Sequence, residues 1–168
     1  MITKTVLETE RLTLKEFSTS DAEFILILLN TPSWQKFIGD KNVHSSEDAE
    51  NYLINGPLKS YRENGFGLWL VLLKDSNISI GMCGLVKRDY LQDIDIGLAL
   101  MPDYEGNGYG FEMANATMVH SRKNLLINSV VAITDANNSS SIKLLNKLGL
   151  HYEKQVESAE GDEVLLFS

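Results

Sequence analysis

The sequence has a single cysteine and no long apolar run. Cys83 therefore has no partner for an internal disulfide, and it lies within the apolar stretch 79–86, away from any cluster of histidines. We interpret it as a buried strand residue rather than as a nucleophile. The N-terminal residues lack an apolar signal core, and no apolar run approaches the ~18 residues that cross a bilayer. We expect a soluble, cytoplasmic protein with no membrane partner.

Histidine and positive charge are also scarce. The three histidines, His44, His120 and His151, lack the spacing of a zinc site, so we expect no metal. The chain carries 15 Lys and Arg against 23 Asp and Glu, and its formal net charge of -8 opposes binding to a phosphate backbone. We therefore expect no nucleic-acid partner. An acidic surface suits a cationic acceptor such as an amine, although a solvated acidic exterior without a role is the commoner explanation.

What is present is the composition of one globular domain. With 168 residues, of which 43% are hydrophobic and 23% charged, the chain is long enough to bury a core of its own. No internal repeat, low-complexity tract or linker-like stretch divides it. We therefore expect a single domain over residues 1–168.

Hydrophobic periodicity predicts a mixture of strands and helices. One half-buried strand is expected over 7–17, followed by a capped helix over 22–29 that Pro32 ends. A second capped helix begins near Ser45 and should kink or split at Gly56-Pro57. The remaining expected elements are the strands 68–73, 78–86, 94–101, 130–134, 152–156 and 164–167 and the helices 108–123 and 138–148. This order predicts an α/β (α+β) fold, a mixed sheet of about seven strands with about four helices on its faces.

The segment 105–111 joins a predicted strand to a predicted helix and contains three glycines. Backbone N–H groups at the head of a helix are unpaired and lie at the positive end of its dipole, so they attract anions. Gly106, Gly108 and Gly110 allow left-handed conformations and a close approach, so that several N–H groups can converge on one diphosphate. The spacing matches neither the dinucleotide fingerprint nor the nucleotide triphosphate loop. The alternative is a flexible strand-to-helix connection without a ligand.

Three segments of the sequence carry a resemblance to a known family. They are LETERLTL at 7–14, IGLALMPDYEGNGYG at 96–110 and TDANNSSSIKLLNKLG at 134–149. With these segments in this order, nearly the whole chain resembles the GNAT acetyltransferase superfamily, specifically its RimJ/RimL-type branch of ribosomal-protein N-terminal acetyltransferases. The chain departs from the family's loop pattern at Glu105, where Gln or Arg is common. We expect the Glu105 carboxylate to point outward, because a diphosphate would repel it.

The resemblance implies an N-acetyltransferase that uses acetyl-coenzyme A, with a mostly antiparallel twisted sheet whose fourth and fifth strands splay apart. The pantetheine arm of the coenzyme would pair with the backbone of residues 98–101, Asn138 would bond this arm, and Ser141 would lie near the thioester sulfur. The cofactor-binding residues implied in this way are Leu100, Met101, Gly106, Asn107, Gly108, Tyr109, Gly110, Asn138 and Ser141. Dimer formation rests on the resemblance alone, so monomer and homodimer both stay open.

Acetyl transfer to an amine needs a base, because an α-amine with a pKa of ~8 or a lysine with a pKa of ~10.4 is mostly protonated at pH 7. Asp95 is the first candidate, since it lies opposite the core-facing isoleucines of its strand and matches a Glu common in the branch. The alternative is a solvent-facing carboxylate without a role.

A main-chain N–H near Leu100 is implied as the oxyanion donor. Many relatives use a Tyr to protonate the departing thiolate, but Leu145 is at the matching position. Ser141 either replaces that acid or is only a helix cap and pantetheine contact.

The sequence does not identify the acceptor amine. We expect the irregular region 30–67 to select it, with aromatic residues either as pocket walls or as core, namely Trp34, Phe37, Tyr61 and Trp69. A protein N-terminus, a polyamine, an amino acid and an antibiotic are alternative acceptors. Two alternatives to an enzyme are a non-catalytic sensor of acyl-coenzyme A and a structural subunit without a cofactor.

Overall fold

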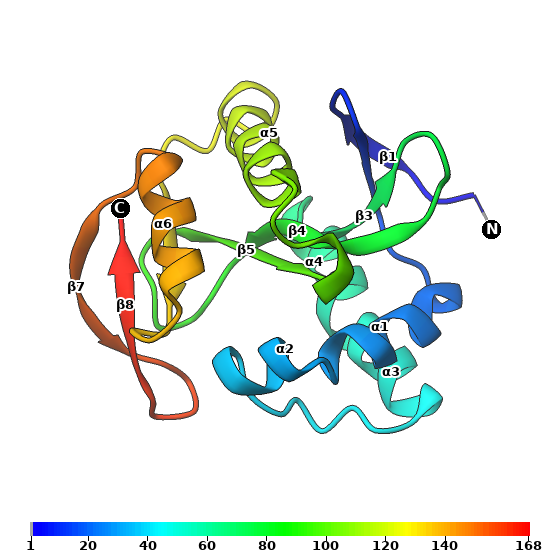
Figure 1. Cartoon of the computed structure of the whole chain (residues 1–168), viewed down its shortest axis with the longest axis horizontal. Helices are drawn as coiled ribbons and strands as arrows, with labels where there is room; N and C mark the ends of the chain where they lie inside the picture. The colour runs from blue at the N-terminus through cyan, green and yellow to red at the C-terminus, as the bar shows by residue number, and fades with distance from the viewer. Residues whose placement is uncertain (1) are drawn as a thin grey trace.

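An eight-stranded sheet forms the centre of the computed structural model, which describes residues 2–168 (Figure 1). The strands are β1 (Thr5–Glu8), β2 (Leu12–Lys15), β3 (Leu68–Leu73), β4 (Ser79–Val86), β5 (Ile94–Leu100), β6 (Val130–Thr134), β7 (Tyr152–Glu157) and β8 (Glu163–Phe167). They lie in the order β1-β2-β3-β4-β5-β6-β8-β7, and every neighbouring pair is antiparallel except β5 and β6. The predicted mixed, mostly antiparallel sheet is confirmed, with one strand more than predicted.

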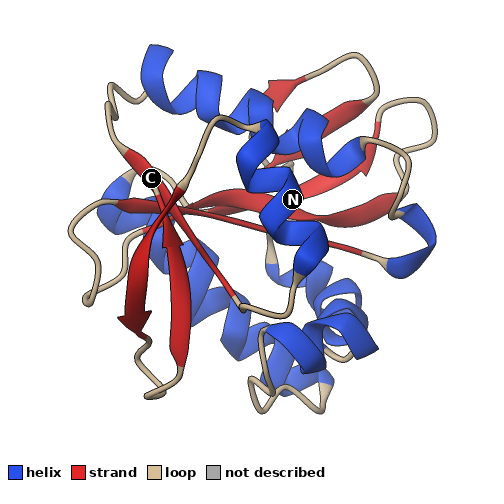
Figure 2. Ribbon diagram, turned by 60° about the vertical axis from the view of Figure 1, so that its left-hand side comes forward, coloured by secondary structure: helices blue, strands red, loops and turns tan. Residues whose placement is uncertain are grey.

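Helices pack against both faces of this sheet (Figure 2). They are α1 (Ala22–Leu29), α2 (Pro32–Phe37), α3 (Ser46–Leu53), α4 (Lys59–Asn64), α5 (Tyr109–Lys123) and α6 (Ser139–Lys147). The helices α1, α2 and α3 share one apolar core with the sheet, and α5 and α6 share the other. Within residues 2–168, no helix is both long enough and apolar enough to cross a membrane.

The two cores arise because strand side chains alternate between the faces of the sheet. The core beneath α1 and α3 includes the almost fully buried residues Ile25, Leu28, Leu53 and Leu70. The core beneath α5 and α6 includes Ile80, Leu85, Ile96, Met113 and Leu145. Full burial of each large aliphatic side chain contributes about 1.5–3 kcal/mol, so these contacts fix the helices on the sheet.

The prediction of one strand over 7–17 is wrong, because the chain turns back on itself in the middle of that segment. The strands β1 and β2 form an antiparallel hairpin in which Leu7 is opposite Leu14. Thr9 closes the turn: its backbone N–H donates to the carbonyl of Leu12 over 2.9 Å, and its hydroxyl accepts from the N–H of Leu12 over 3.0 Å. The hydroxyl of Thr9 therefore stabilises a tight turn at a position where glycine or proline is more common.

Side-chain hydrogen bonds precede α1 and begin α3, the two places where caps are predicted, although Asp21, the N-cap residue of α1, makes no side-chain bond to that helix. Asp21 accepts from the N–H of Ser18 before α1, and Ser45 accepts from the N–H of Asp48 at the start of α3. Pro32, however, does more than follow the end of α1. It is the first residue of α2, an unpredicted helix, because a proline at this position loses no helical hydrogen bond.

The predicted interruption at Gly56-Pro57 is confirmed. A π-helical turn over Ile54–Leu58 joins α3 to α4, and Pro57 lies inside it. Because Pro57 has no N–H, it cannot donate the α-helical hydrogen bond to the preceding turn. The wider turn accommodates this loss, and α4 ends at Gly65, whose φ is +75°.

The strands β5 and β6 diverge soon after they begin. Ile94 is opposite Val130 and Asp95 is opposite Val131, and these are the only pairs between the two strands within residues 2–168. β5 stays paired with β4 up to Leu100 on its other side. These are the fourth and fifth predicted strands, so the prediction that they splay apart is confirmed. The splaying leaves one edge of β5 open from Ile96 onward.

Candidate functional site

The segment between β5 and α5 folds into a turn that depends on two glycines. A 3-10 turn over Pro102–Tyr104 follows β5, then Gly106 has a φ of +76° and Gly108, the N-cap of α5, has a φ of +83°. Both angles lie in the left-handed region, which residues with a Cβ rarely adopt. Gly110 is already helical, so the prediction of a left-handed glycine is wrong at that position.

The backbone of this turn fits an anion. Within residues 2–168, the N–H groups of Gly106 and Gly108 donate no hydrogen bond, and the first turn of α5 leaves further N–H groups unpaired. A Cβ built at Gly106 meets nothing within 4 Å, so the turn adjoins open space. We call residues 105–110 the nest. Its N–H groups and the positive end of the α5 dipole favour a ligand such as a diphosphate.

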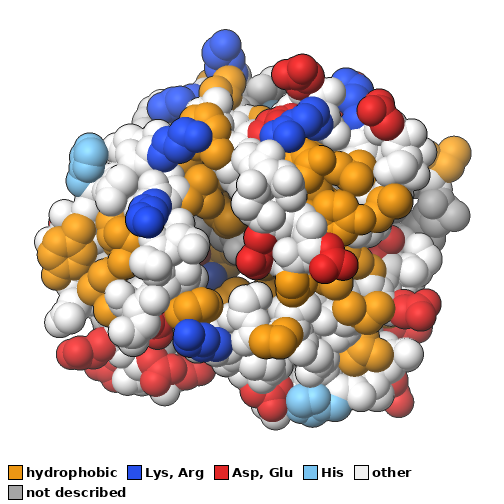
Figure 3. Space-filling model, in the orientation of Figure 1, with side chains coloured by type: hydrophobic (Ala, Val, Ile, Leu, Met, Phe, Trp, Pro, Cys, Tyr) orange, Lys and Arg blue, Asp and Glu red, His pale blue; other side chains and the backbone are white. Residues whose placement is uncertain are grey.

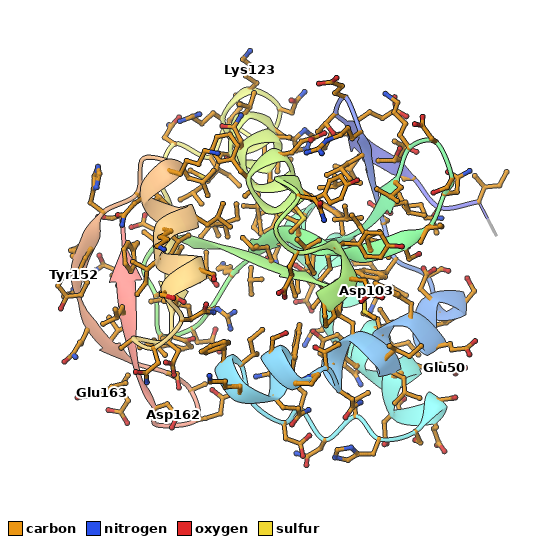
Figure 4. All side chains as sticks on the ribbon, viewed as in Figure 1. Glu50, Asp103, Lys123, Tyr152, Asp162 and Glu163 are labelled. Atoms are coloured by element: carbon orange, nitrogen blue, oxygen red, sulfur yellow. The ribbon has the colours of Figure 1, made fainter. Side chains whose placement is uncertain are left out.

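The acidic residue of the nest lies at the surface. Glu105 is exposed, as its neighbours 106–108 are, and the outward direction of its carboxylate stays a prediction. Figure 4 shows the face of the molecule that is also seen in Figure 1. On it, α5 runs from the middle, near Asp103, to Lys123 at the margin of the molecule. In the space-filling view the surface is hollowed near the middle of this same face, and acidic and hydrophobic side chains border the hollow (Figure 3).

The open edge of β5 offers main-chain hydrogen bonds next to the nest. The N–H of Met101 donates to the carbonyl of Ile80 over 2.8 Å, and the carbonyl of Met101 accepts from the N–H of Tyr104 over 3.0 Å. Both backbone groups of Met101 are therefore engaged. Because N–H groups alternate between the two edges of a strand, those of Leu98 and Leu100 point away from β4 and toward the open edge.

The helix α6 packs beside the nest through Leu144, in its second half. A Cβ built at Gly110 would be 3.6 Å from Cδ2 of Leu144 on α6 and 3.9 Å from Cδ1 of Leu100 on β5. At the head of α6, Oδ1 of Asn138 accepts from the backbone N–H of Ser141 over 3.2 Å, so Asn138 is the helix cap. The hydroxyl of Ser141 forms no hydrogen bond within residues 2–168, and it lies one turn before Leu144. The cap interpretation of the Ser141 hydroxyl is therefore wrong.

Asp95 lies where β5 and β6 part, and it is not a solvent-facing carboxylate. Its side chain is 1% exposed, and its Oδ2 accepts from Nε of Arg88 over 2.7 Å. Burial raises the pKa of Asp95 to about 6, although the guanidinium of Arg88 opposes this shift. Within residues 2–168, Oδ1 is buried without a hydrogen bond of normal geometry, although the backbone N–H of Ile133 on β6 lies near enough to lower the pKa of the carboxyl. A buried carboxylate with one unpaired oxygen can accept a proton from a further group.

The other groups considered from the sequence have structural surroundings. Cys83 is fully buried on β4, and burial raises the pKa of its thiol to about 12. Trp69 packs edge-on against His120 at 5.7 Å, and both line a hollow near the C-terminal end of α5, whereas the hydroxyl of Tyr61 bonds the backbone of β3. Residues 2–168 contain no group of three or more His, Cys, Asp or Glu side chains placed to hold a metal ion.

Sequence reasoning missed two arginines near these groups. Arg88 partners Asp95, and Arg11 contacts the nest from the β1–β2 hairpin. Arg11 belongs to the LETERLTL segment, which gave the resemblance but assigned no role to the arginine. Its acidic partner, Glu112, lies in the first turns of α5, where an acidic residue is common because of the helix dipole.

Comparison with known proteins finds a family that covers most of the chain. Residues 11–151 match the family described as the Acetyltransferase (GNAT) domain. The uncharacterised protein YkkB of Bacillus subtilis is 27% identical over 162 residues, which cover 93% of this chain and 91% of YkkB. YoaA of Bacillus subtilis, described as an uncharacterised N-acetyltransferase, is 26% identical over 149 residues, which cover 88% of this chain and 84% of YoaA.

A solved structure matches the fold. RimL, a ribosomal L7/L12 α-N-protein acetyltransferase in complex with coenzyme A, superimposes with a TM-score of 0.82. The match covers 98% of this chain and 96% of RimL, at 19% sequence identity. At that identity the likeness to the RimJ/RimL-type branch is a likeness of fold.

Proposed function

Because the chain belongs to the GNAT acetyltransferase family, we propose that it moves an acetyl group from acetyl-coenzyme A to a primary amine by direct attack in a ternary complex. Members of this family are acyltransferases with acetyl-coenzyme A as the donor. The observation that carries the proposal is that the nest opens beside a strand edge with unpaired N–H groups and packs against a second helix, α6, at Leu144. These three features suit the two ends of one long ligand, a diphosphate and a thioester arm.

The main chain does most of the donor binding. The N–H groups at Gly106, Asn107 and Gly108, with those at Tyr109 and Gly110 in the first turn of α5, bind the diphosphate. Along the open edge of β5, Leu98 and Leu100 bond the amide groups of the pantetheine arm as an additional strand would. Asn138 has its amide nitrogen left for the arm, because only its oxygen is used by the cap.

Asp95 is the proposed general base. Its pKa of about 6 keeps it ionised at pH 7 while leaving it a stronger base than an exposed carboxylate. Oδ1 is the atom that takes the proton, through water because the buried carboxylate is out of direct reach of the amine, while Oδ2 stays bonded to Arg88. An amine can attack only after this proton has left.

Two further groups act on the charge that develops during transfer. The N–H of Leu100 points to the open edge and is the proposed oxyanion donor, a role in which a fixed main-chain dipole is effective. The thioester supplies an activated acyl group, and its departing thiolate is stabilised by a proton donor. Leu145, at the position where many relatives have a Tyr, is 2% exposed and belongs to the core, so Ser141 is the proposed donor.

An amine acceptor agrees with the net negative charge of the chain. Asp103 precedes the nest, and Asp162 and Glu163 lie at the end of the β7–β8 hairpin (Figure 4). With a formal net charge of -8, the chain attracts a cationic acceptor to this face at low salt. A protein N-terminus and a small-molecule amine both meet this requirement.

The proposal is tested by following release of free thiol from acetyl-coenzyme A in the presence of amines and N-terminal peptides. We expect thiol release that depends on the acceptor, with an acetylated product of matching amount. Binding of coenzyme A without release on any acceptor would contradict amine acetylation and favour the sensor. If acetyl-coenzyme A at ~100 times its expected dissociation constant fails to raise the melting temperature, the nest does not bind the donor at all.

A further inference from the structure

The β1–β2 hairpin reaches the nest through the side chain of Arg11. Nη1 of Arg11 donates to the backbone carbonyl of Asn107 over 3.0 Å, and Nε donates to Oε2 of Glu112 over 2.7 Å. The guanidinium also lies 4.3 Å from the centre of the Tyr109 ring. One side chain therefore contacts three residues of the nest and of the first turns of α5, from 96 residues or more away in the sequence.

The bond to Asn107 sets the direction of a nest N–H. A trans peptide is planar, so the carbonyl of Asn107 and the N–H of Gly108 belong to one rigid unit and point in opposite directions. Arg11 holds the carbonyl on its own side, and the N–H of Gly108 consequently points away from Arg11. A flipped peptide would instead present a carbonyl dipole to an anion, which repels it.

The bond to Glu112 removes a charge that would oppose an anion. Burial raises the pKa of Glu112, but hydrogen bonds from the Thr9 hydroxyl at 2.7 Å and from Arg11 outweigh it, and the pKa is lowered. The carboxylate is therefore ionised in the same helix turns that would receive the diphosphate. Arg11 supplies the compensating charge through its side chain, and its backbone N–H donates to Oε1 over 2.9 Å.

We propose that Arg11 is a positioning residue for the coenzyme: it orients the Asn107–Gly108 peptide and neutralises Glu112, without itself touching the reacting atoms. This inference rests on the proposed function, because the ligand it serves is the diphosphate of the donor. Its guanidinium packs against the loop from the side of the hairpin, where a Cβ built at Gly108 would be 3.3 Å from Nη2. Arg11 is therefore required for affinity toward the diphosphate part of the donor and not for chemistry on the thioester.

The test compares Arg11→Met with a matched control, Lys74→Met. Lys74 also bonds the hairpin, through the carbonyl of Thr9 at 3.1 Å, and its side chain is 40% exposed against 41% for Arg11, but it has no contact with the nest. Binding of coenzyme A is measured by calorimetry. Loss of one orienting hydrogen bond corresponds to about tenfold weaker binding in Arg11→Met, and we expect no change in Lys74→Met.

A second ligand separates positioning from general loosening of the fold. Acetyl-pantetheine has the thioester arm but no diphosphate, so it does not reach the nest. We expect Arg11→Met to raise the KM for acetyl-coenzyme A with little change in kcat, and to leave kcat/KM for acetyl-pantetheine unchanged. Equal losses with both donors would show a merely structural role, and unchanged affinity for coenzyme A would overturn the inference.

Two further variants keep the inference testable if Arg11→Met folds poorly. Arg11→Lys keeps the charge beside Glu112 but loses the planar fork, so its affinity for coenzyme A should lie between those of the wild type and Arg11→Met. Adding Glu112→Gln to Arg11→Met removes the uncompensated charge and should recover part of the affinity. Absence of that recovery would overturn the charge argument. If the wild-type protein itself does not bind coenzyme A, the proposed function fails instead.

Discussion

Nε of Arg88 donates to Oδ2 of Asp95 over 2.7 Å, and this ion pair leaves Oδ1 of Asp95 buried without a hydrogen bond of normal geometry within residues 2–168. The pair joins the β4–β5 connection to the beginning of β5, at the point where β5 leaves β6. Desolvation raises the pKa of the carboxyl, the guanidinium of Arg88 and the backbone N–H of Ile133 lower it, and the result is a pKa of about 6. Asp95 is thus tuned toward neutral pH by two opposing effects.

Replacing Asp95 by Asn should spare donor binding and slow transfer. The amide has nearly the shape of the carboxyl but accepts no proton from the amine, so we expect kcat to fall by ~10²–10⁴-fold, the usual contribution of a general base. Thiol release measures kcat, and calorimetry with coenzyme A measures binding. Unchanged turnover in Asp95→Asn would remove this residue from the mechanism.

The pH dependence of stability gives a check that does not depend on activity. The pKa of Asp95 is raised from 3.8 to about 6 on folding, so between these pH values the folded state binds more protons than the unfolded state. Stability contributed by Asp95 therefore falls as the pH rises through this window. Urea unfolding of the wild type and of Asp95→Asn at several pH values should show this slope in the wild type only. If the free energy of unfolding has the same dependence on pH in the two proteins, Asp95 is not buried in solution.

Removing the guanidinium of Arg88 should move the activity profile. Without this cation, only the backbone N–H of Ile133 opposes the effect of burial on Asp95, so its pKa rises above the value of about 6. In Arg88→Met the acid limb of kcat/KM should therefore shift to higher pH, with less activity at neutral pH and partial recovery in alkali. Arg122→Met, which removes an exposed arginine near the end of α5, is the control. An unshifted limb in Arg88→Met would show that another group controls it.

Much of the fold could be predicted because the sheet elements are short apolar runs between turn residues. Val130–Thr134 and Leu68–Leu73 were predicted with their observed bounds for this reason. The β1–β2 turn was not, because Thr9 makes it through its own hydroxyl and no glycine or proline marks it. The start of α2 was missed because a proline is compatible both with the end of one helix and with the first residue of the next.

The site could be predicted in part for a similar reason. The nest depends on glycines and a helix start that adjoin in sequence, so local reasoning finds it. The partners of Asn107 and Asp95 could not be predicted. Arg11 is 96 residues from Asn107 in the sequence, and Arg88 reaches Asp95 because of the conformation of the loop between β4 and β5. Burial of Asp95 depends on residues packed on both sides of β5, and no alternation within one strand reveals this.

A β-branched residue at Gly108 should abolish donor binding. Gly108 has a φ of +83°, so Gly108→Val strains the backbone by about 1–3 kcal/mol or forces the Asn107–Gly108 peptide to turn. Gly149→Val is the matched control, because Gly149 has a φ of +89° at the end of α6, outside the nest. Both variants should lose stability in thermal melts, but only Gly108→Val should lose binding of coenzyme A. Equal binding by the two variants would exclude the nest as the diphosphate site.

Ser141→Ala separates a proton donor from a structural residue, because the cap at the head of α6 uses the backbone N–H of Ser141 and not its hydroxyl. The variant keeps that bond, so its melting temperature should equal that of the wild type, whereas Asn138→Ala loses the cap and about 1 kcal/mol of stability. If the hydroxyl protonates the departing thiolate, Ser141→Ala should lower kcat for acetyl-coenzyme A. The deficit should shrink with an acetyl thioester of a more acidic thiol, because such a thiolate leaves without a proton. A raised KM with unchanged kcat would instead make Ser141 a contact for the pantetheine arm, and Asp95 would then be the only side chain of this site that moves a proton.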